Sequence, residues 1–312
     1  MPEVEVWQAV ADELTAGGSC GLLVVAQAHP DHPLRRGMLM AVTRDGPMRG
    51  TIGGGPTEDE LVARAAGSLR EGALPAELVP VTPGPDDPWL SGPVDGSAPT
   101  VVVAPLTPSD LPGVRRMIEA LSAGRPVEWC ADPGGWRVVM EGLSPGIGLV
   151  GAARHWSYAQ SSGPTHSVHL IGSGHVAAAL APLLMELEFR VVVVEERPNA
   201  DPASVVAHER LRLAYEDLAS VVPAGPTSFV AVLGHTISRD AAALAALEPL
   251  EFGYLGVLGT ARAVRQLVGE RPMPAWFHAP MGLPIGSATP AEIAVAVAAE
   301  LVAVRSTGVE RL

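Results

Sequence analysis

Hydrophobic and polar positions follow two different patterns along the chain, and the pattern changes near residue 160. In the first part, short apolar runs between polar turns predict β-strands, and apolar residues at helical spacing predict helices. The predicted strands are 21–27, 38–43, 48–52, 100–105, 127–130 and 136–140, and the predicted helices are 4–16, 58–70 and 109–123. This mixture indicates an α+β domain over residues 1–150. Frequent Gly, Ser and Pro then indicate a linker at 151–165.

Strands and helices alternate regularly in the second part. The predicted strands are 167–171, 190–194, 228–233 and 252–255, and the predicted helices are 174–188, 239–247, 260–267 and 290–304. Such alternation is typical of a parallel sheet covered by helices on both faces. We therefore predict an α/β protein whose C-terminal domain, residues 166–312, is Rossmann-like and doubly wound.

The charged residues change this picture by excluding several functions. All 21 basic side chains are arginine, and 34 acidic residues leave a net charge of −13. Without lysine, Schiff-base catalysis, a Walker A loop and the protein-kinase strand lysine are impossible. The acidic balance argues against a nucleic-acid partner, and no apolar run reaches the roughly 18 residues of a membrane span. We expect a cytoplasmic protein with a small-molecule ligand.

The segment VHLIGSGHVAAAL carries the strongest local motif. Gly172 and Gly174 follow a predicted strand and open a helix, and Ala177 allows that helix to pack closely. The amides at the helix start, including those of His175 and Val176, would bind a diphosphate. Glu195, 21 residues after Gly174, would favour a free ribose 2′-hydroxyl, whereas Arg197 could instead meet a 2′-phosphate.

Other segments could also bind an anion or transfer a proton. Gly53, Gly54 and Gly55 lie between a predicted strand and a helix, so their amides could converge on a ligand, with Arg36 as a clamp. Gly282 and Gly286 form a tight loop before a helix that Thr289 and Glu292 should cap as a capping box. The candidate catalytic residues are His235 and Asp240, after a predicted strand end, and Glu58. Each of these features also has an ordinary structural explanation.

Several ordered blocks resemble the XdhC/CoxI family, the accessory factors of xanthine dehydrogenase and carbon-monoxide dehydrogenase. These blocks are RRGMLMAVTRDG, GTIGGGPTEDELVARA, IGSGHVAAAL, VVVVEERP, GHTISRD, GYLGVLGTARA and PMGLPIGSATPAEIAVAVAAELVA. The resemblance implies that the chain binds the molybdenum cofactor, protects it during sulfuration and delivers it to a molybdenum hydroxylase. Gly53–Gly55, Arg36, Glu58 and the Gly172 loop would seat the pterin and its phosphate or nucleotide tail. The resemblance also suggests a homodimer.

Three positions depart from the family pattern. Pro56 stands where the family carries a cysteine, although Glu58 is retained, and the second family cysteine would fall near Ser91. The family's Gly-Ser-Arg run begins here at Gly259, but its arginine is displaced to Arg262.

Two further functions therefore remain open beside molybdenum-cofactor handling. The first alternative is an NAD(P)-dependent oxidoreductase that acts on a small metabolite. Gly172, Gly174 and Glu195 would hold NAD(H), and His235 would transfer the proton. The second alternative is a scaffold that has kept the fold and lost the chemistry. No metal ligand set is readable from the sequence.

Overall fold

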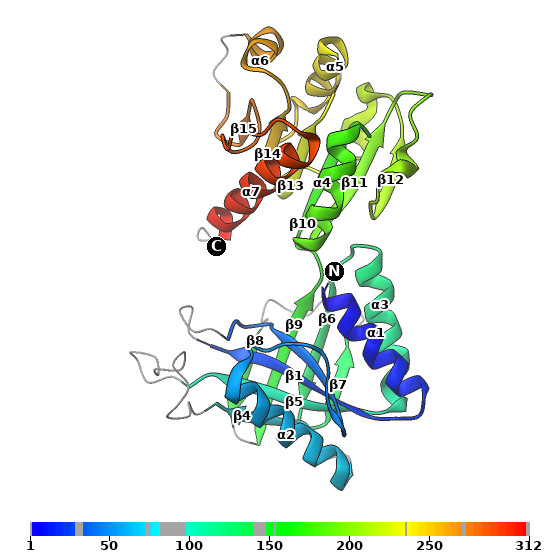
Figure 1. Cartoon of the computed structure of the whole chain (residues 1–312), viewed down its shortest axis with the longest axis vertical. Coiled ribbons are helices and arrows are strands. Elements are labelled where there is room, and N and C mark those ends of the chain that lie inside the picture. The colour runs from blue at the N-terminus through cyan, green and yellow to red at the C-terminus, as the bar shows by residue number, and fades with distance from the viewer. Residues whose placement is uncertain are drawn as a thin grey trace. The chain divides into compact units, whose positions relative to one another are not determined.

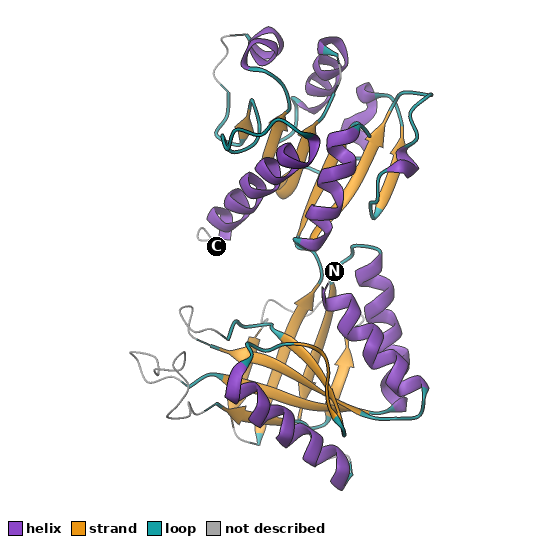
Figure 2. Cartoon of the chain, viewed as in Figure 1, coloured by secondary structure: helices purple, strands orange, loops and turns teal. Residues whose placement is uncertain are grey.

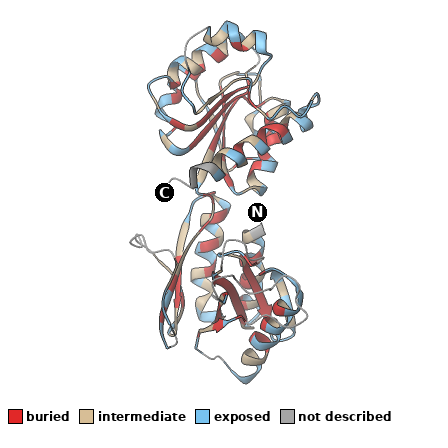
Figure 3. Ribbon diagram, turned by 90° about the vertical axis from the view of Figure 1, so that its left-hand side faces the viewer, coloured by how far each residue is buried: buried red, intermediate tan, exposed pale blue. Residues whose placement is uncertain are grey.

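The computed structural model describes residues 2–28, 34–72, 75–81, 98–139, 148–152, 154–234, 236–269 and 273–309. The chain divides into two compact units, Met1–Gly163 (unit 1) and Pro164–Leu312 (unit 2). Buried residues gather on the strands of each unit (Figure 3). Each unit is described by itself.

Unit 1 contains a five-stranded antiparallel sheet in the order β3-β2-β1-β5-β4. Its strands are β1 (Cys20–Gln27), β2 (Leu39–Thr43), β3 (Gly46–Gly50), β4 (Glu77–Pro80) and β5 (Thr100–Leu106). Successive residues of β1 point to opposite faces, as strand geometry requires. Leu22 and Val24 pack in a cluster with α1 (Pro2–Thr15) and α3 (Leu111–Ser122), which follows the short 3-10 turn Pro108–Asp110. Leu23 and Val25 pack with α2 (Gly55–Glu71) instead.

A second antiparallel sheet completes unit 1, in the order β7-β6-β9-β8. It consists of β6 (Val127–Asp132), β7 (Gly135–Val138), β8 (Gly148–Ala152) and β9 (His155–Ser162). Most of the expected linker, residues 151–165, therefore lies in β8 and β9. Its Gly and Ser residues suggested a linker, but β9 pairs with β6 and buries Trp156 and Tyr158. These aromatic side chains belong to the same cluster as Trp7.

Unit 2 contains a six-stranded parallel sheet in the order β12-β11-β10-β13-β14-β15. The strands are β10 (His166–Ile171), β11 (Phe189–Glu195), β12 (Glu209–Arg212), β13 (Gly225–Val232), β14 (Phe252–Val257) and β15 (Phe277–His278). In order of sequence, this arrangement is 3-2-1-4-5-6, the order of Rossmann dinucleotide-binding folds. The strand order reverses between β10 and β13, where such folds bind ligands.

Helices cover both faces of this sheet (Figures 1 and 2). On one face, α4 (His175–Glu186) packs beside α7 (Pro290–Val309), over Val191 and Val193. On the other face, α5 (Ile237–Leu247) packs with the 3-10 segment Tyr215–Ser220 over Val192 and Val194. The remaining elements are α6 (Ala261–Val268), which packs against α5, and the 3-10 turn Pro202–Ser204.

These two architectures confirm the predicted fold class, an α+β unit followed by a doubly wound parallel sheet. Five strands were not predicted. They are β4, β8 and β9 of unit 1, and β12 and β15 of unit 2. Within the described ranges, no helix combines the length and the apolar composition that crossing a bilayer requires.

Candidate functional site

The Gly172 turn brings the end of β10 against the end of β13. Gly172 has φ +112°, and its amide donates to the carbonyl of Val194 at 2.8 Å. A Cβ at this position would lie 3.2 Å from the carbonyl oxygen of Leu233. Glycine is required because a side chain would be strained by both the backbone angle and this contact. The turn therefore lies at the sheet edge where the strand order reverses.

The helix after this turn begins without a side-chain cap. Gly174 is the N-cap residue of α4 and supplies no side-chain cap, and no side chain among the described residues bonds the amides of His175 or Val176. The first main-chain bond of this region runs from the Ala178 amide to the Gly174 carbonyl at 3.0 Å. The amides at the start of α4, including those of His175 and Val176, are the ones that such a helix leaves for an anion. His175 is exposed and Val176 half-buried, so this end of the helix is accessible.

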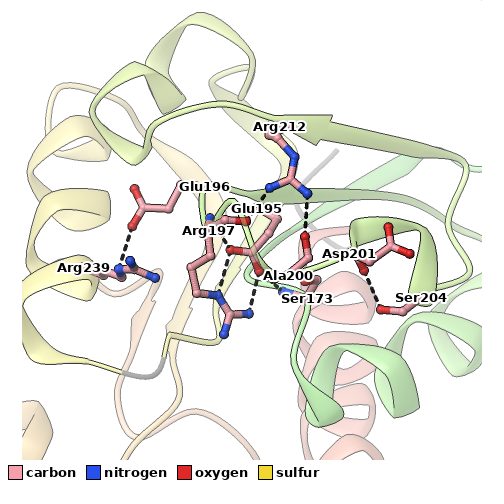
Figure 4. Close-up of polar contacts among 9 residues, drawn as sticks. All are labelled: Ser173, Glu195, Glu196, Arg197, Ala200, Asp201, Ser204, Arg212 and Arg239. Atoms are coloured by element: carbon pink, nitrogen blue, oxygen red, sulfur yellow. Dashed lines mark hydrogen bonds and ion pairs between the residues drawn. The ribbon is translucent and has the colours of Figure 1, made fainter.

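Glu195 ends β11 with a side chain that is fully buried and saturated with hydrogen bonds (Figure 4). Its Oε2 accepts from the Ser173 amide at 3.0 Å, from Ser173 Oγ at 2.7 Å and from Arg197 Nη2 at 2.7 Å. Its Oε1 accepts from the Arg197 amide at 2.8 Å and Nε at 2.9 Å. Burial opposes the charge, but the bonds from Arg197 and Ser173 outweigh it and lower the pKa of Glu195 to about 2.

This bonding changes what Glu195 could offer a ligand. A carboxylate accepts about four hydrogen bonds, and Glu195 already receives five. In this arrangement, hydrogen bonds to the Glu195 carboxylate link Ser173, within the glycine turn, to Arg197. The Arg197 side chain keeps 28% of its surface exposed. Of this ion pair, only the guanidinium therefore reaches the surface.

Two further arginines support the segment after β11. Arg212 donates to the carbonyls of Arg197 and Ala200, and Arg239 pairs with Glu196 at 3.1 Å (Figure 4). These contacts fix the path of the chain just after β11. The predicted ribose and phosphate preferences of Glu195 and Arg197 both stay predictions.

Asp240 lies at the same sheet edge, against the end of β13. Its side chain is 6% exposed, and a Cβ on Gly234 would fall 1.3 Å from Asp240 Oδ1. Oδ1 has no hydrogen-bond partner among the described residues. Burial therefore raises the pKa of Asp240 to about 6. The other predicted catalytic residue here, His235, lies outside the described residues.

In unit 1, the carboxylate of Glu58 accepts hydrogen bonds from the triple-glycine loop that precedes α2. Glu58 Oε2 accepts from Thr51 Oγ at 2.6 Å, from the Ile52 amide at 2.8 Å and from the Gly54 amide at 3.0 Å. Partial burial opposes ionisation, but these bonds lower the pKa of Glu58. Of the three glycine amides that we expected to converge on a ligand, that of Gly54 donates to Glu58, and that of Gly53 donates to Thr51 Oγ1 at 3.1 Å. Gly53 and Gly55, at φ +138° and +78°, shape the turn before α2.

The remaining predicted clamp and the cysteines lie elsewhere in unit 1. The Arg36 guanidinium lies beside Gly148 of β8, 3.0 Å from where a Cβ would stand, and beside Tyr158. Cys20 and Cys130 are the only cysteines of the chain, and both are buried. Burial raises the pKa of Cys20 to about 12. Pro56 occupies the first turn of α2, where its missing amide costs no helical bond, and Ser91 lies outside the described residues.

The predicted capping box at the start of α7 is confirmed. The Thr289 amide donates to Glu292 Oε2 at 2.8 Å, and the Glu292 amide donates to Thr289 Oγ1 at 3.3 Å. Gly286, at φ +79°, precedes this box. Gly259 precedes α6, whose first turn is capped by the Thr260 hydroxyl.

Three residues of unit 2 form a polar cluster that the sequence did not reveal. His278 of β15, Tyr254 of β14 and Glu300 of α7 meet around the Glu300 carboxylate. The amide of Gly282 also donates to Glu300 Oε2, at 2.6 Å. One signal could have indicated the cluster: Glu300 is the only charged residue in the otherwise apolar stretch 293–304.

The structure thus places the predicted site residues in separate groups. In unit 2, Gly172 follows β10, Glu195 is the last residue of β11, and Asp240 packs against Gly234 just after β13, so these predicted residues share one sheet edge. Gly53–Gly55 and Glu58 belong to unit 1. Within the described part of the chain, no group of three or more His, Cys, Asp or Glu side chains could hold a metal ion.

Comparison with known proteins agrees with this architecture. Residues 168–301 match the model of the XdhC Rossmann domain, and residues 14–77 match the model of the XdhC and CoxI family. A probable xanthine dehydrogenase subunit from Bacillus subtilis is 30% identical over 144 residues, which are 46% of this chain and 44% of that protein. The uncharacterized protein YqeB from Escherichia coli is 35% identical over 152 residues, 44% of this chain and 27% of that protein. The matches therefore span less than half the length of either relative.

A solved structure shares the whole fold. The crystal structure described as a xanthine dehydrogenase from Bacillus halodurans has a TM-score of 0.74 and 20% sequence identity. The similarity covers 98% of this chain and 96% of that chain.

Proposed function

The chain belongs to the XdhC and CoxI family, and from this premise we propose that it is an accessory protein that binds the molybdenum cofactor for maturation of a molybdenum hydroxylase. The observation that carries the proposal is the uncapped start of α4 at the Gly172 turn. Its amides and helix dipole suit the phosphate or diphosphate of a pterin cofactor. The xanthine dehydrogenase names of two similar proteins suggest the class of client.

The residues at this sheet edge suit the phosphate end of this cofactor. Because the chain has no lysine, the amides of α4 and the Arg197 guanidinium would carry the anion contact. No cysteine thiolate is available to bind the metal end of the cofactor, because both cysteines are buried. When bound, the cofactor would bring its molybdenum with the ligands that it already has. The protein would then hold the cofactor by its tail and shield it from solvent.

Titration of the full chain with isolated molybdenum cofactor tests this proposal. Gly174 has φ −75° and ψ −174°, which any residue can adopt, so Gly174→Trp should block the seat without straining the backbone. The matched control is Glu251→Trp, at an exposed position before β14, at the opposite edge of the sheet. We expect saturable binding by the wild type and by Glu251→Trp, and at least tenfold weaker binding by Gly174→Trp. Equal binding by all three proteins would refute this seat.

Thiol alkylation separates this proposal from binding through sulfur. Iodoacetamide should leave cofactor affinity unchanged because Cys20 and Cys130 are both buried. Loss of binding after alkylation of the folded protein would show that a cysteine takes part.

One observation favours the second candidate, an NAD(P)-dependent oxidoreductase. The buried carboxyl of Asp240, with its pKa raised to about 6, could take up and release a proton at this sheet edge near neutral pH. Saturable binding of NAD(H) or NADP(H), with no response to molybdenum cofactor, would support this function over the accessory role.

A further inference from the structure

We propose that His278 forms a second binding group of unit 2, which accepts a hydrogen bond at Nε2 from an N–H group of a heteroaromatic ligand. Glu300 and Tyr254 hold its ring in position for this role. The inference depends on the proposed function only for the identity of the ligand.

The Glu300 carboxylate sets the protonation of the histidine ring. Glu300 Oε2 accepts from the Tyr254 hydroxyl at 2.7 Å and from the Gly282 amide at 2.6 Å. Burial and the bond to Glu300 raise the pKa of Tyr254, so this hydroxyl stays protonated and donates. Both bonds use Oε2 as an acceptor, and an ionised carboxylate offers acceptor atoms only. Oε1 lies 3.1 Å from His278 Nδ1, which must then carry a proton.

In the neutral form of the ring, this assignment leaves Nε2 with its lone pair. Nε2 makes no hydrogen bond with any described residue and is not among their buried unpaired atoms. The His278 side chain is 25% exposed, whereas Glu300 is 14% exposed. Solvent or a ligand therefore reaches the outer nitrogen, while the inner one is bound to Glu300.

Packing also fixes the orientation of the ring. The Tyr254 ring stacks on the His278 ring with centroids 4.5 Å apart and an interplanar angle of 24°. A Cβ at Gly256 would lie 2.5 Å from the Tyr254 hydroxyl and 2.8 Å from Met281 Sδ. There is little free space around the tyrosine, so its hydroxyl keeps Glu300 in place.

The position of His278 in the sheet matches that of a ligand group. His278 is the last residue of β15 and pairs with Gly256, near the carboxyl end of β14. All strands of this sheet are parallel, so His278 lies at the same edge as the Gly172 turn. Ligands of open α/β sheets bind outside this edge. A ligand with its phosphate at α4 could extend across β13 and β14 toward His278.

Heteroaromatic bases fit this arrangement because they present ring N–H donors beside flat apolar surface. The ring of His278 is neutral when Nε2 is free, and Glu300 makes that nitrogen a stronger acceptor. Pterins belong to this class of ligand, which connects the group to the proposed cofactor.

Nuclear magnetic resonance of the full chain with ¹⁵N-labelled histidine tests the protonation directly. We expect His278 to carry its proton on Nδ1 at neutral pH, and Glu300→Gln to change this tautomer. A proton on Nε2 in the wild type would overturn the inference. Diethyl pyrocarbonate, which modifies free imidazole nitrogens, should react with His278 at least threefold more slowly in Glu300→Gln than in the wild type.

Binding of isolated molybdenum cofactor tests the ligand contact. His278→Gln should weaken binding at least tenfold, whereas His155→Gln, an exposed histidine of unit 1, should not. Circular dichroism melting identifies any loss that reflects unfolding. Binding by His278→Gln within twofold of the wild type would overturn the contact.

The two proposals can fail separately. If wild-type protein binds no cofactor, the proposed function fails, and His278 is judged by its tautomer and its reaction with diethyl pyrocarbonate. A normal Nε2–H tautomer or an unreactive ring would then refute the inference, because His278 would be a structural residue.

Discussion

Replacing Glu195 with glutamine should destabilise unit 2 in a pH-dependent way. The carboxylate is fully buried and its pKa falls from 4.5 to about 2 on folding. This difference corresponds to about 3 kcal/mol of stabilisation by the ionised form. Because the folded pKa is the lower one, the stabilisation is fully present above about pH 5 and is lost as the pH falls toward 2. Glu195→Gln should therefore cost about 3 kcal/mol at pH 7, and less than half of that at pH 3.

Urea unfolding read by hydrogen–deuterium exchange mass spectrometry reports each unit through its own peptides. Peptides of β10 and β11 should show the loss, whereas peptides of unit 1 should be unchanged and serve as an internal control. Glu292→Gln is the matched variant, since Glu292 also accepts amide bonds but is exposed, and it should cost clearly less. A difference below about 0.5 kcal/mol at pH 7, the size of an ordinary surface substitution, would refute the reasoning.

Three further predictions concern stability. Asp240 titrates in the opposite sense: its folded pKa is raised to about 6 from 3.8, so ionising it costs stability as the pH rises from 4 toward 8. The stability of Asp240→Asn relative to the wild type should therefore improve by up to about 3 kcal/mol over this range. If urea titrations show a stability difference between the two proteins that does not change with pH, this prediction is contradicted. Gly234→Ala should destabilise unit 2 because its Cβ would overlap Asp240 Oδ1, and Asp240→Ala should relieve most of the loss in a double-mutant cycle. Glu58→Ala should cost unit 1 about 1 kcal/mol, as for a lost helix cap, and Glu60→Ala, exposed on the same helix, should not.

Much of unit 2 could be predicted from the sequence because its signals are local. Buried parallel strands are continuous apolar runs, and a glycine turn between strand and helix needs no distant residue to be recognised. The Thr289–Glu292 capping box spans only four residues, and it forms as predicted. The glycine turn at Gly172 and Gly174 was indicated in the same way.

The strands that were missed lack such local signals. The strand β15 has two residues, and β8 is a Gly-containing segment whose burial pattern is mostly exposed. Such segments become strands because a neighbour supplies their hydrogen bonds. For β9, that neighbour is β6, about 30 residues earlier in the chain.

By itself, the sequence determined the two-part α/β architecture, the absence of lysine chemistry and the location of the glycine turns. Only the tertiary structure decided what binds the amides of those turns. Glu195 binds Ser173 from 22 residues away, and Glu300 meets His278 across the same separation. Periodicity reflects which face of an element is buried, and it is encoded within a few residues. Hydrogen-bond partners depend on how separate elements pack, which no short stretch of sequence specifies.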